Sequence, residues 1–277
     1  MSKYCIYLDS ITKDFNYEHI IPLSLGGCDD FVIEVDRGFN SSVGSSIDGD
    51  VANDFLVLFE RDRFKAKGHS KKHEKPLIKN VRLKDGRPAQ AIFGQEGLRI
   101  FDLQRKRPLP LTDSAGGEIK CNFKMEMGID LFFVAKVALA AGYFAYGEAF
   151  KSYVKHSELR KIITADKISL PPNIKAKFYD RFFETTDDIE FMIVKMATEI
   201  GGCSSVLILP SENSFGVAVG VLGKFMGFII VPSQSKHLPN SDDYRLGHCM
   251  FIQDGKLKRF SFDYLRQRLL TKFDEKL

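Results

Sequence analysis

The N-terminal part of this chain is the most constrained, because turn and cap residues divide it into short elements in a fixed order. Residues 15–22 form an extended segment that ends at a proline, which cannot continue a central strand. Gly26-Gly27 predicts a turn, and the Phe-Val-Ile-Glu-Val run at 31–35 predicts a second strand. Asn40 or Ser41 can then cap a helix. The predicted order is strand, turn, strand and helix, with a further helix expected over 50–59.

Three side chains of this segment suit the cleavage of a phosphodiester bond. Glu18 directly precedes His19, and Asn40 opens the predicted helix. Carboxylate and amide oxygens can bind a divalent cation, and a neighbouring histidine can deprotonate a water molecule. Adjacent side chains of a strand point to opposite faces, so Glu18 and His19 share one site only if the backbone twists there or each reaches it from its own side.

These residues belong to a longer pattern. The stretch Glu-His-Ile-Ile-Pro-x-x-Leu-Gly-Gly at 18–27, with Asn40 and Gly44 after it, resembles the motif of the HNH endonuclease family, in the variant that opens with Glu-His. The resemblance covers residues 1–60. It implies the ββα-metal fold, in which two strands and a helix surround one divalent cation.

The resemblance also implies a role for each residue. His19 matches the general base, while Glu18 and Asn40 match the ligands of the cation, for which Mg²⁺ or Mn²⁺ is expected. Asp30 is predicted to take the place of the family's middle asparagine and to orient His19. Asp29-Asp30 occupies that part of the chain.

One departure from the family concerns zinc. Many relatives carry two C-x-x-C pairs that bind a structural zinc, but here the matching positions hold Cys5 with Leu8, and Asp36 with Phe39. A tetrahedral structural zinc needs four good ligands. We therefore expect no structural zinc, and apolar packing by Leu8 and Phe39 in its place.

Basic residues are concentrated just after the motif. The 277-residue chain has 40 Lys and Arg against 36 Asp and Glu, and this net charge of +4 is too small to indicate nucleic-acid binding by itself. Ten of the 40 lie between Arg61 and Lys84. Such a segment suits the phosphate backbone of DNA, and a solvated loop is the alternative. The predicted DNA contacts are Arg37, Arg61, Arg63, Lys71 and Lys72.

The rest of the chain predicts an α+β protein in three parts: the HNH-like module at 1–60, a basic connecting region with short strands at 61–122, and an α+β domain at 123–277. The last contains a long helix over 128–154 and an antiparallel sheet. Residues 187–200 fit either a helix or a strand.

The sequence favours a reducing compartment. Five scattered cysteines form no C-x-x-C pair, and the N-terminus lacks the apolar core of a secretion signal. The apolar run at 129–146 contains Asp130 and Lys136 and is interpreted as a buried helix rather than a membrane span. We expect a cytoplasmic protein with no membrane partner.

Together these features predict a metal-dependent HNH endonuclease that hydrolyses DNA, with a role in restriction or phage defence. RNA remains open as a substrate. The C-terminal part is left open between target recognition, ligand sensing and dimerisation, the last of which would give a homodimer. The alternative is a non-catalytic nucleic-acid-binding or regulatory protein with a degenerate ββα fold.

Overall fold

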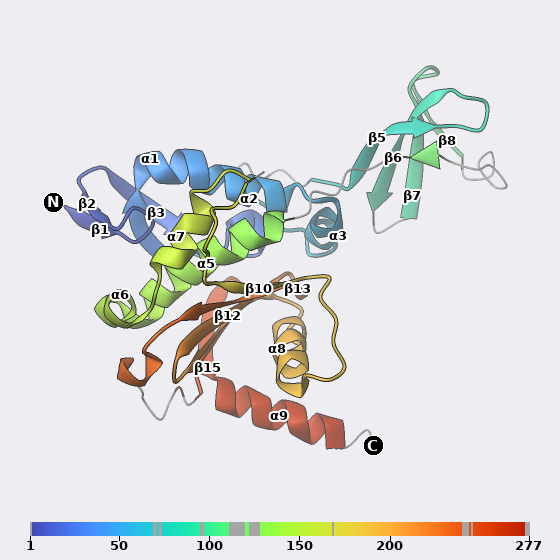
Figure 1. Ribbon diagram of the computed structural model, residues 1–277. Helices are drawn as coiled ribbons and strands as arrows, with labels where there is room; N and C mark the ends of the chain where they lie inside the picture. Colours follow the sequence, from blue (N-terminus) through green and yellow to red (C-terminus); the bar gives the residue numbers. More distant parts are fainter. Residues whose placement is uncertain are drawn as a thin grey trace. The chain divides into compact units, whose positions relative to one another are not determined.

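The computed structural model describes residues 2–68, 71, 74–94, 97–110, 120–121, 128–167, 169–239, 244 and 246–274. The chain forms two compact units: Met1–Val51 together with Gly128–Leu277, and an inserted unit, Ala52–Met127 (Figure 1). The α+β class is confirmed. The predicted division into 1–60, 61–122 and 123–277 differs from the structure, because the N-terminal elements pack with the segment after residue 128 in one unit.

The first unit begins with two antiparallel hairpins followed by one continuous helical segment. Strand β1 pairs with β2, and β3 pairs with β4 so that His19 lies opposite Val32. The predicted order of strand, turn, strand and helix is thus confirmed. The elements are β1 (Lys3–Cys5), β2 (Ser10–Thr12), β3 (Phe15–His19), η1 (Leu23–Leu25), β4 (Val32–Asp36), α1 (Arg37–Phe39), η2 (Asn40–Gly44) and α2 (Ser45–Ala52).

The helix begins earlier than predicted. Asp36 is its N-cap, because its Oδ1 accepts a hydrogen bond from the backbone N–H of Phe39 at 2.9 Å. Asn40 therefore lies one turn inside the helical segment, at the start of the π-helical turn η2. The prediction that Asn40 or Ser41 caps the helix is wrong, because the aspartate at the end of β4 satisfies the free N–H groups first.

A six-stranded antiparallel sheet forms the centre of the first unit. Its order is β10 (Lys177–Asp180), β13 (Lys224–Pro232), β12 (Ser214–Val221), β11 (Ser204–Ser211), β14 (His248–Gln253) and β15 (Lys256–Ser261). The meander predicted from the β-rich runs is confirmed. Helices α8 (Ile189–Glu199) and α9 (Phe262–Asp274) bury Phe191 and Leu265 against one face, in a cluster with Leu207, Ala218 and Phe251. Residues 187–200 are thus mainly helical.

The opposite face of the sheet is covered by helix α5 (Ile129–Tyr146), which is followed by α6 (Glu148–Tyr153) and α7 (Ser157–Ile163) (Figure 1). The single helix predicted over 128–154 breaks at Gly147, which has φ 52°. The break lets α6 fold back, and Phe150 packs so closely on Gly142 that a Cβ there would lie 2.3 Å from its ring. A short helix, η3 (Ser235–His237), follows β13.

Helix α5 is the one helix in the described part of the chain with the length and composition to cross a membrane, and 72% of its residues are buried inside the folded protein. It is a core helix of the first unit.

The Gly26-Gly27 turn rests on the central sheet. Gly26 has φ 79°, and a Cβ on Gly27 would lie 1.8 Å from the carbonyl oxygen of Ile21. The hydroxyl of Ser204 in β11 donates to the carbonyl of Leu25 at 2.5 Å. Both glycines are therefore required by the backbone, and the turn fixes the β3–β4 hairpin on the sheet.

The inserted unit contains helix α3 (Phe55–Arg63) and a five-stranded antiparallel sheet. Asp54 caps α3, so the helix predicted over 50–59 is instead the end of α2 and the start of α3. The sheet order is β8 (Arg107–Leu109), β7 (Gly97–Asp102), β6 (Pro88–Gly94), β5 (Leu77–Arg82) and β9 (Lys120–Cys121). Its core is small, built around Ile78, Val81 and Ile100.

Candidate functional site

Glu18 lies in the interior of the first unit, where it pairs with a lysine rather than facing an open cleft. Its side chain projects from β3, and its Oε1 accepts a hydrogen bond from Nζ of Lys136 on α5. The same ammonium donates to both carboxylate oxygens of Asp48 on α2, each at 2.9 Å. Lys136 is 0% exposed and Glu18 is 7% exposed. One buried ammonium therefore bridges two carboxylates from different elements.

The charges of this cluster depend on one another. Burial by itself lowers the pKa of Lys136, but the carboxylates of Asp48 and Glu18 outweigh it and hold that pKa above its ordinary value. Burial raises the pKa of Asp48 to about 6, although Lys136 opposes this. The hydroxyl of Tyr7 is also buried near these groups, and within the described residues it has no hydrogen-bond partner.

Asn40 lies on the same side of the helix as Asp48 and Gly44. Its Nδ2 donates to Oδ1 of Asn16 on β3 at 3.3 Å. A Cβ on Gly44 would lie 2.9 Å from Oδ1 of Asn40 and 3.6 Å from Cε of Lys136. The absent side chain at Gly44 thus makes room for the amide of Asn40, while a Cβ there would be in ordinary contact with Lys136. That Glu18 and Asn40 share one cation stays a prediction.

The donor types in this cluster match a divalent cation, but their arrangement does not. Glu18, Asp48 and Asn40 offer the oxygen ligands that Mg²⁺ and Mn²⁺ prefer. The ammonium of Lys136 already occupies the space between the two carboxylates, from a fully buried position. No group of three or more His, Cys, Asp or Glu in the described part of the chain is placed to hold a metal ion. The residues as arranged therefore do not fit the expected cation.

His19 lies at the end of β3 with 17% of its side chain exposed. Its Nε2 is 2.9 Å from Oδ1 of Asp29, which is 91% exposed. Asp29, rather than the predicted Asp30, is the carboxylate that orients the imidazole. The tight turn before β4, in which the N–H of Phe31 bonds to the carbonyl of Cys28, brings the first of the two aspartates to His19.

The positions expected to replace a structural zinc are packed differently from the prediction. Tyr7 and Phe39 stack with ring centroids 5.0 Å apart, and the buried Cys5 Sγ accepts from the N–H of Asp36 at 3.2 Å. Phe39 thus packs as predicted, but Leu8 is 43% exposed. The aromatic ring of Tyr7 takes the role assigned to Leu8. The expected absence of zinc stays a prediction.

The five predicted DNA contacts have different surroundings. Arg61 is 5% exposed and its Nη1 donates to the carbonyl of Ala52 at 2.6 Å, so it stabilises the end of α2 and is not a surface contact. Arg63 is exposed and pairs with Glu60. Arg37 is exposed and donates to Asp14 at 2.8 Å. Lys71 is exposed, and Lys72 lies outside the described residues.

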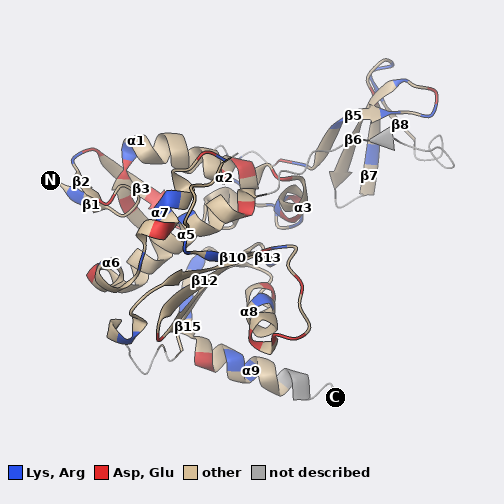
Figure 2. Ribbon diagram, in the orientation of Figure 1, with Lys and Arg blue, Asp and Glu red and all other residues tan. Residues whose placement is uncertain are grey.

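The inserted unit carries the basic charge of the protein. Residues 52–127 contain 17 Lys and Arg against ten Asp and Glu, a net charge of +7. The net charge of the whole chain is +4, so the first unit has a net charge of −3. Figure 2 shows basic residues on β5 and β7 of the inserted sheet. The predicted basic segment is thus part of a larger basic unit.

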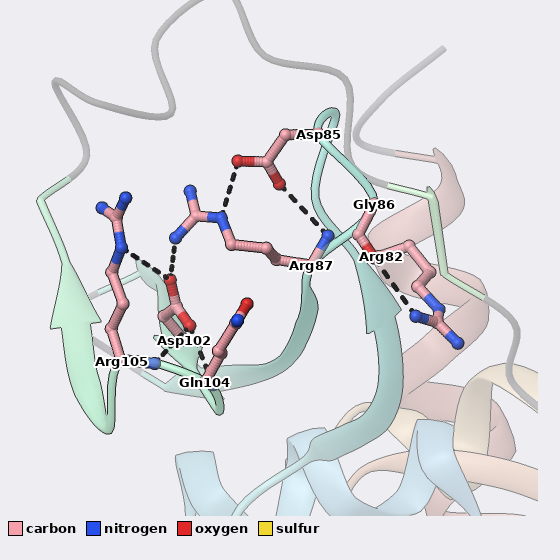
Figure 3. A network of polar contacts seen from close by, with 7 residues as sticks. All are labelled: Arg82, Asp85, Gly86, Arg87, Asp102, Gln104 and Arg105. Carbon is pink, nitrogen blue, oxygen red and sulfur yellow. Dashed lines mark hydrogen bonds and ion pairs between the residues drawn. The ribbon is translucent and has the colours of Figure 1, made fainter.

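A buried carboxylate organises part of this unit (Figure 3). Asp102, at the end of β7, is 0% exposed. Its Oδ1 accepts from the N–H groups of Gln104 and Arg105 at 2.9 and 2.8 Å, and its Oδ2 accepts from Nη1 of Arg87. Arg87 also donates from Nε to Asp85 at 2.6 Å. Asp102 therefore connects the β5–β6 turn to the β7–β8 turn.

Sequence reasoning missed three of these residues, Lys136, Asp48 and Asp102, and chose Asp30 over the neighbouring Asp29. Lys136 carried a signal, because it is a charge within the apolar run of α5. The others lie in polar stretches where no local pattern distinguishes them. No protein-family model, curated protein or solved structure matches this chain.

Proposed function

We propose that this protein is an endonuclease that acts on DNA, with His19 as the base that activates water. The observation that carries the proposal is the contact of His19 with Asp29 at the exposed end of β3, within a strand–strand–helix module whose motif resembles HNH enzymes. A carboxylate that holds an imidazole fixes its orientation and tautomer. The partly exposed ring can then accept a proton from a water molecule beside a phosphate.

The inserted unit supports the second requirement of such an enzyme, which is a surface for the polyanion. Its net charge of +7 attracts phosphates, and the first unit, at −3, does not compete for them. In this proposal the inserted unit holds the DNA backbone and the β3–β4 module acts on the bond. A cation could bind at Glu18 only after the Lys136 ammonium had left that carboxylate.

A second candidate is a nucleic-acid-binding protein that does not cleave. The pairing of Lys136 with Glu18 and Asp48 favours it, since the lysine supplies the positive charge that a cation would bring and is itself buried away from any substrate. Both candidates share the basic inserted unit, and they differ in whether His19 acts on a bond.

The cytoplasm is the proposed location. Cys5, Cys28, Cys203 and Cys249 are free thiols. Free thiols suit a reducing compartment. A role in restriction or phage defence remains part of the proposal by resemblance alone.

A cleavage assay tests the proposal and separates the candidates. Supercoiled plasmid and single-stranded DNA are incubated with the wild type, in Mg²⁺, in Mn²⁺ and in EDTA. Cleavage that is lost in His19→Ala and kept in His237→Ala, a control at an exposed histidine of the same unit, supports the endonuclease. DNA binding without cleavage under all conditions supports the second candidate.

A further inference from the structure

The inserted sheet has one strongly basic end, formed by two turns from separate hairpins. The β5–β6 turn and the β7–β8 turn lie at the same end, since Ala89 of β6 pairs with Asp102 of β7. We define the basic end as Arg82, Lys84, Arg87, Arg105, Lys106 and Arg107. Asp85 and Asp102 are the acidic residues within these turns, so the local net charge is +4.

Asp102 holds the two turns together from the inside. It accepts from two N–H groups of its own turn and from the side chain of Arg87 on the other (Figure 3). Nε of Arg105 lies 4.0 Å from the same carboxylate. On the neighbouring strand, Nη1 of Arg82 donates to the carbonyl of Gly86 at 3.1 Å. The backbone of both turns is therefore fixed before any ligand arrives, which lowers the entropy cost of binding.

The basic side chains of this end divide into two groups. Arg87 lies between Asp85 and Asp102 and has a structural role. The other five are exposed: Lys84, Arg105 and Lys106 on the two turns, Arg82 at the end of β5 and Arg107 at the start of β8. Cations carried on rigid turns at a sheet end can contact successive phosphates of one strand, and arginine adds a planar fork that matches phosphate oxygens.

We propose that the basic end of the inserted sheet binds the sugar-phosphate backbone of DNA. The inference rests on the proposed function, in which DNA is the ligand of this protein, and it names the surface that holds it. Lys84, Lys106 and Arg107 contact the phosphates. Asp102 is a positioning residue that keeps their two turns in register.

The test measures DNA affinity by fluorescence anisotropy of a short labelled duplex at several NaCl concentrations, using the full chain. The variant Lys84→Ala/Lys106→Ala/Arg107→Ala is compared with Lys236→Ala/Lys256→Ala/Lys258→Ala, which removes the same charge from exposed sites of the first unit. We expect the first variant to lose at least about tenfold in affinity and to show a salt slope shallower by about two to three. The control should bind like the wild type.

Two single variants separate positioning from charge. Asp85→Asn and Asp102→Asn each remove one negative charge from the basic end. The half-exposed Asp85 should tolerate the change, and affinity should rise or stay the same. Asp102→Asn should lower affinity although it makes the basic end more positive, because the amide Nδ2 that replaces Oδ2 cannot accept from Arg87, so the side-chain link between the two turns is lost. Circular dichroism checks that the Asp102→Asn protein is folded. If it is not, the Lys84→Ala/Lys106→Ala/Arg107→Ala variant still tests the surface, because it leaves Asp102 in place.

Each opposing result has a distinct meaning. Unchanged affinity and salt slope in the basic-end variant overturn the inference. The proposed function still stands in that case if the wild-type protein binds and cleaves DNA. An equal loss of affinity in the first-unit control shows a general charge effect and also overturns the inference. The inference is likewise overturned if the wild type binds polyglutamate as tightly as it binds DNA. If the wild type binds no DNA under any salt condition, the proposed function itself fails.

Discussion

Lys136 and Glu18 are 118 residues apart in the sequence and form a buried ion pair that connects helix α5 to strand β3. Asp48 completes it from α2. The pair stands at the place where the sequence predicted a divalent cation. The stability of the first unit therefore depends on a single ammonium group. The same ammonium competes with any metal ion for the oxygens of Glu18 and Asp48.

Replacing Lys136 with Met should destabilise the protein strongly, because it leaves two carboxylates buried without their counter-ion. Removing one partner of a buried pair costs about 3–5 kcal/mol. Lys167→Met is the control: its pair with Asp50 is exposed, and its loss should cost less than about 1 kcal/mol. Urea unfolding followed by circular dichroism gives both values. The triple variant Lys136→Met/Glu18→Gln/Asp48→Asn should recover part of the lost stability, because it leaves no buried charge unpaired. Equal destabilisation by Lys136→Met and Lys167→Met would contradict a central role for the buried pair.

Divalent cations should bind the wild type weakly at Glu18, because Lys136 already neutralises its carboxylate. Lys136→Gln frees the oxygens of Glu18 and Asp48, so Mn²⁺ should bind this variant more tightly. Calorimetric titration with MnCl₂ and the shift of the melting temperature by MgCl₂ measure this directly. Tight stoichiometric Mn²⁺ binding by the wild type, lost in both Glu18→Gln and Asn40→Ala, would show that the cation displaces the lysine and that the original ligand assignment holds.

Loss of the base should affect cleavage and leave binding intact. His19→Ala should slow single-turnover DNA cleavage by about 10²–10⁴. Asp29→Asn should produce a smaller slowing, since it removes only the carboxylate that orients the ring. Asp30→Asn, one residue away and exposed, is the matched control and should behave like the wild type. A larger effect at Asp30 than at Asp29 would restore the prediction made from the sequence.

The core histidine of the central sheet should make the protein sensitive to acid. His248 lies between the rings of Tyr244 and Tyr146, and its Nδ1 faces Nη2 of Arg259 at 3.2 Å. Burial, with a smaller contribution from Arg259, lowers the pKa of His248 to about 4. Between about pH 6.5 and pH 4 the unfolded chain therefore binds a proton that the folded protein does not.

This contribution to stability is complete above about pH 6.5 and is lost as the pH falls towards 4, by about 3 kcal/mol in all. His248→Gln removes the titration, so its unfolding free energy should fall less over this window. Urea unfolding at a series of pH values compares the two proteins. Parallel curves would mean that other groups cause the acid sensitivity.

The sequence determined the local elements of this protein. The Gly26-Gly27 turn, the β11–β13 meander and the strand–strand–helix order follow from backbone preferences and hydrogen bonds that operate within a few residues. The sequence also placed Glu18, His19 and Asn40 on one module. It misplaced the helix start, because Asp36 and Asn40 are both good caps and the geometry at the end of β4 chooses between them.

Tertiary structure alone decided what surrounds these residues. Burial made Arg61 a structural contact, and the turn before β4 selected Asp29 over Asp30. The lysine in α5 reached Glu18 only because that helix packs between the N-terminal module and the sheet. The sequence gives the charge of a side chain, but the partner of that charge depends on which distant elements pack together in the core. For Glu18 the partner is the ammonium of Lys136.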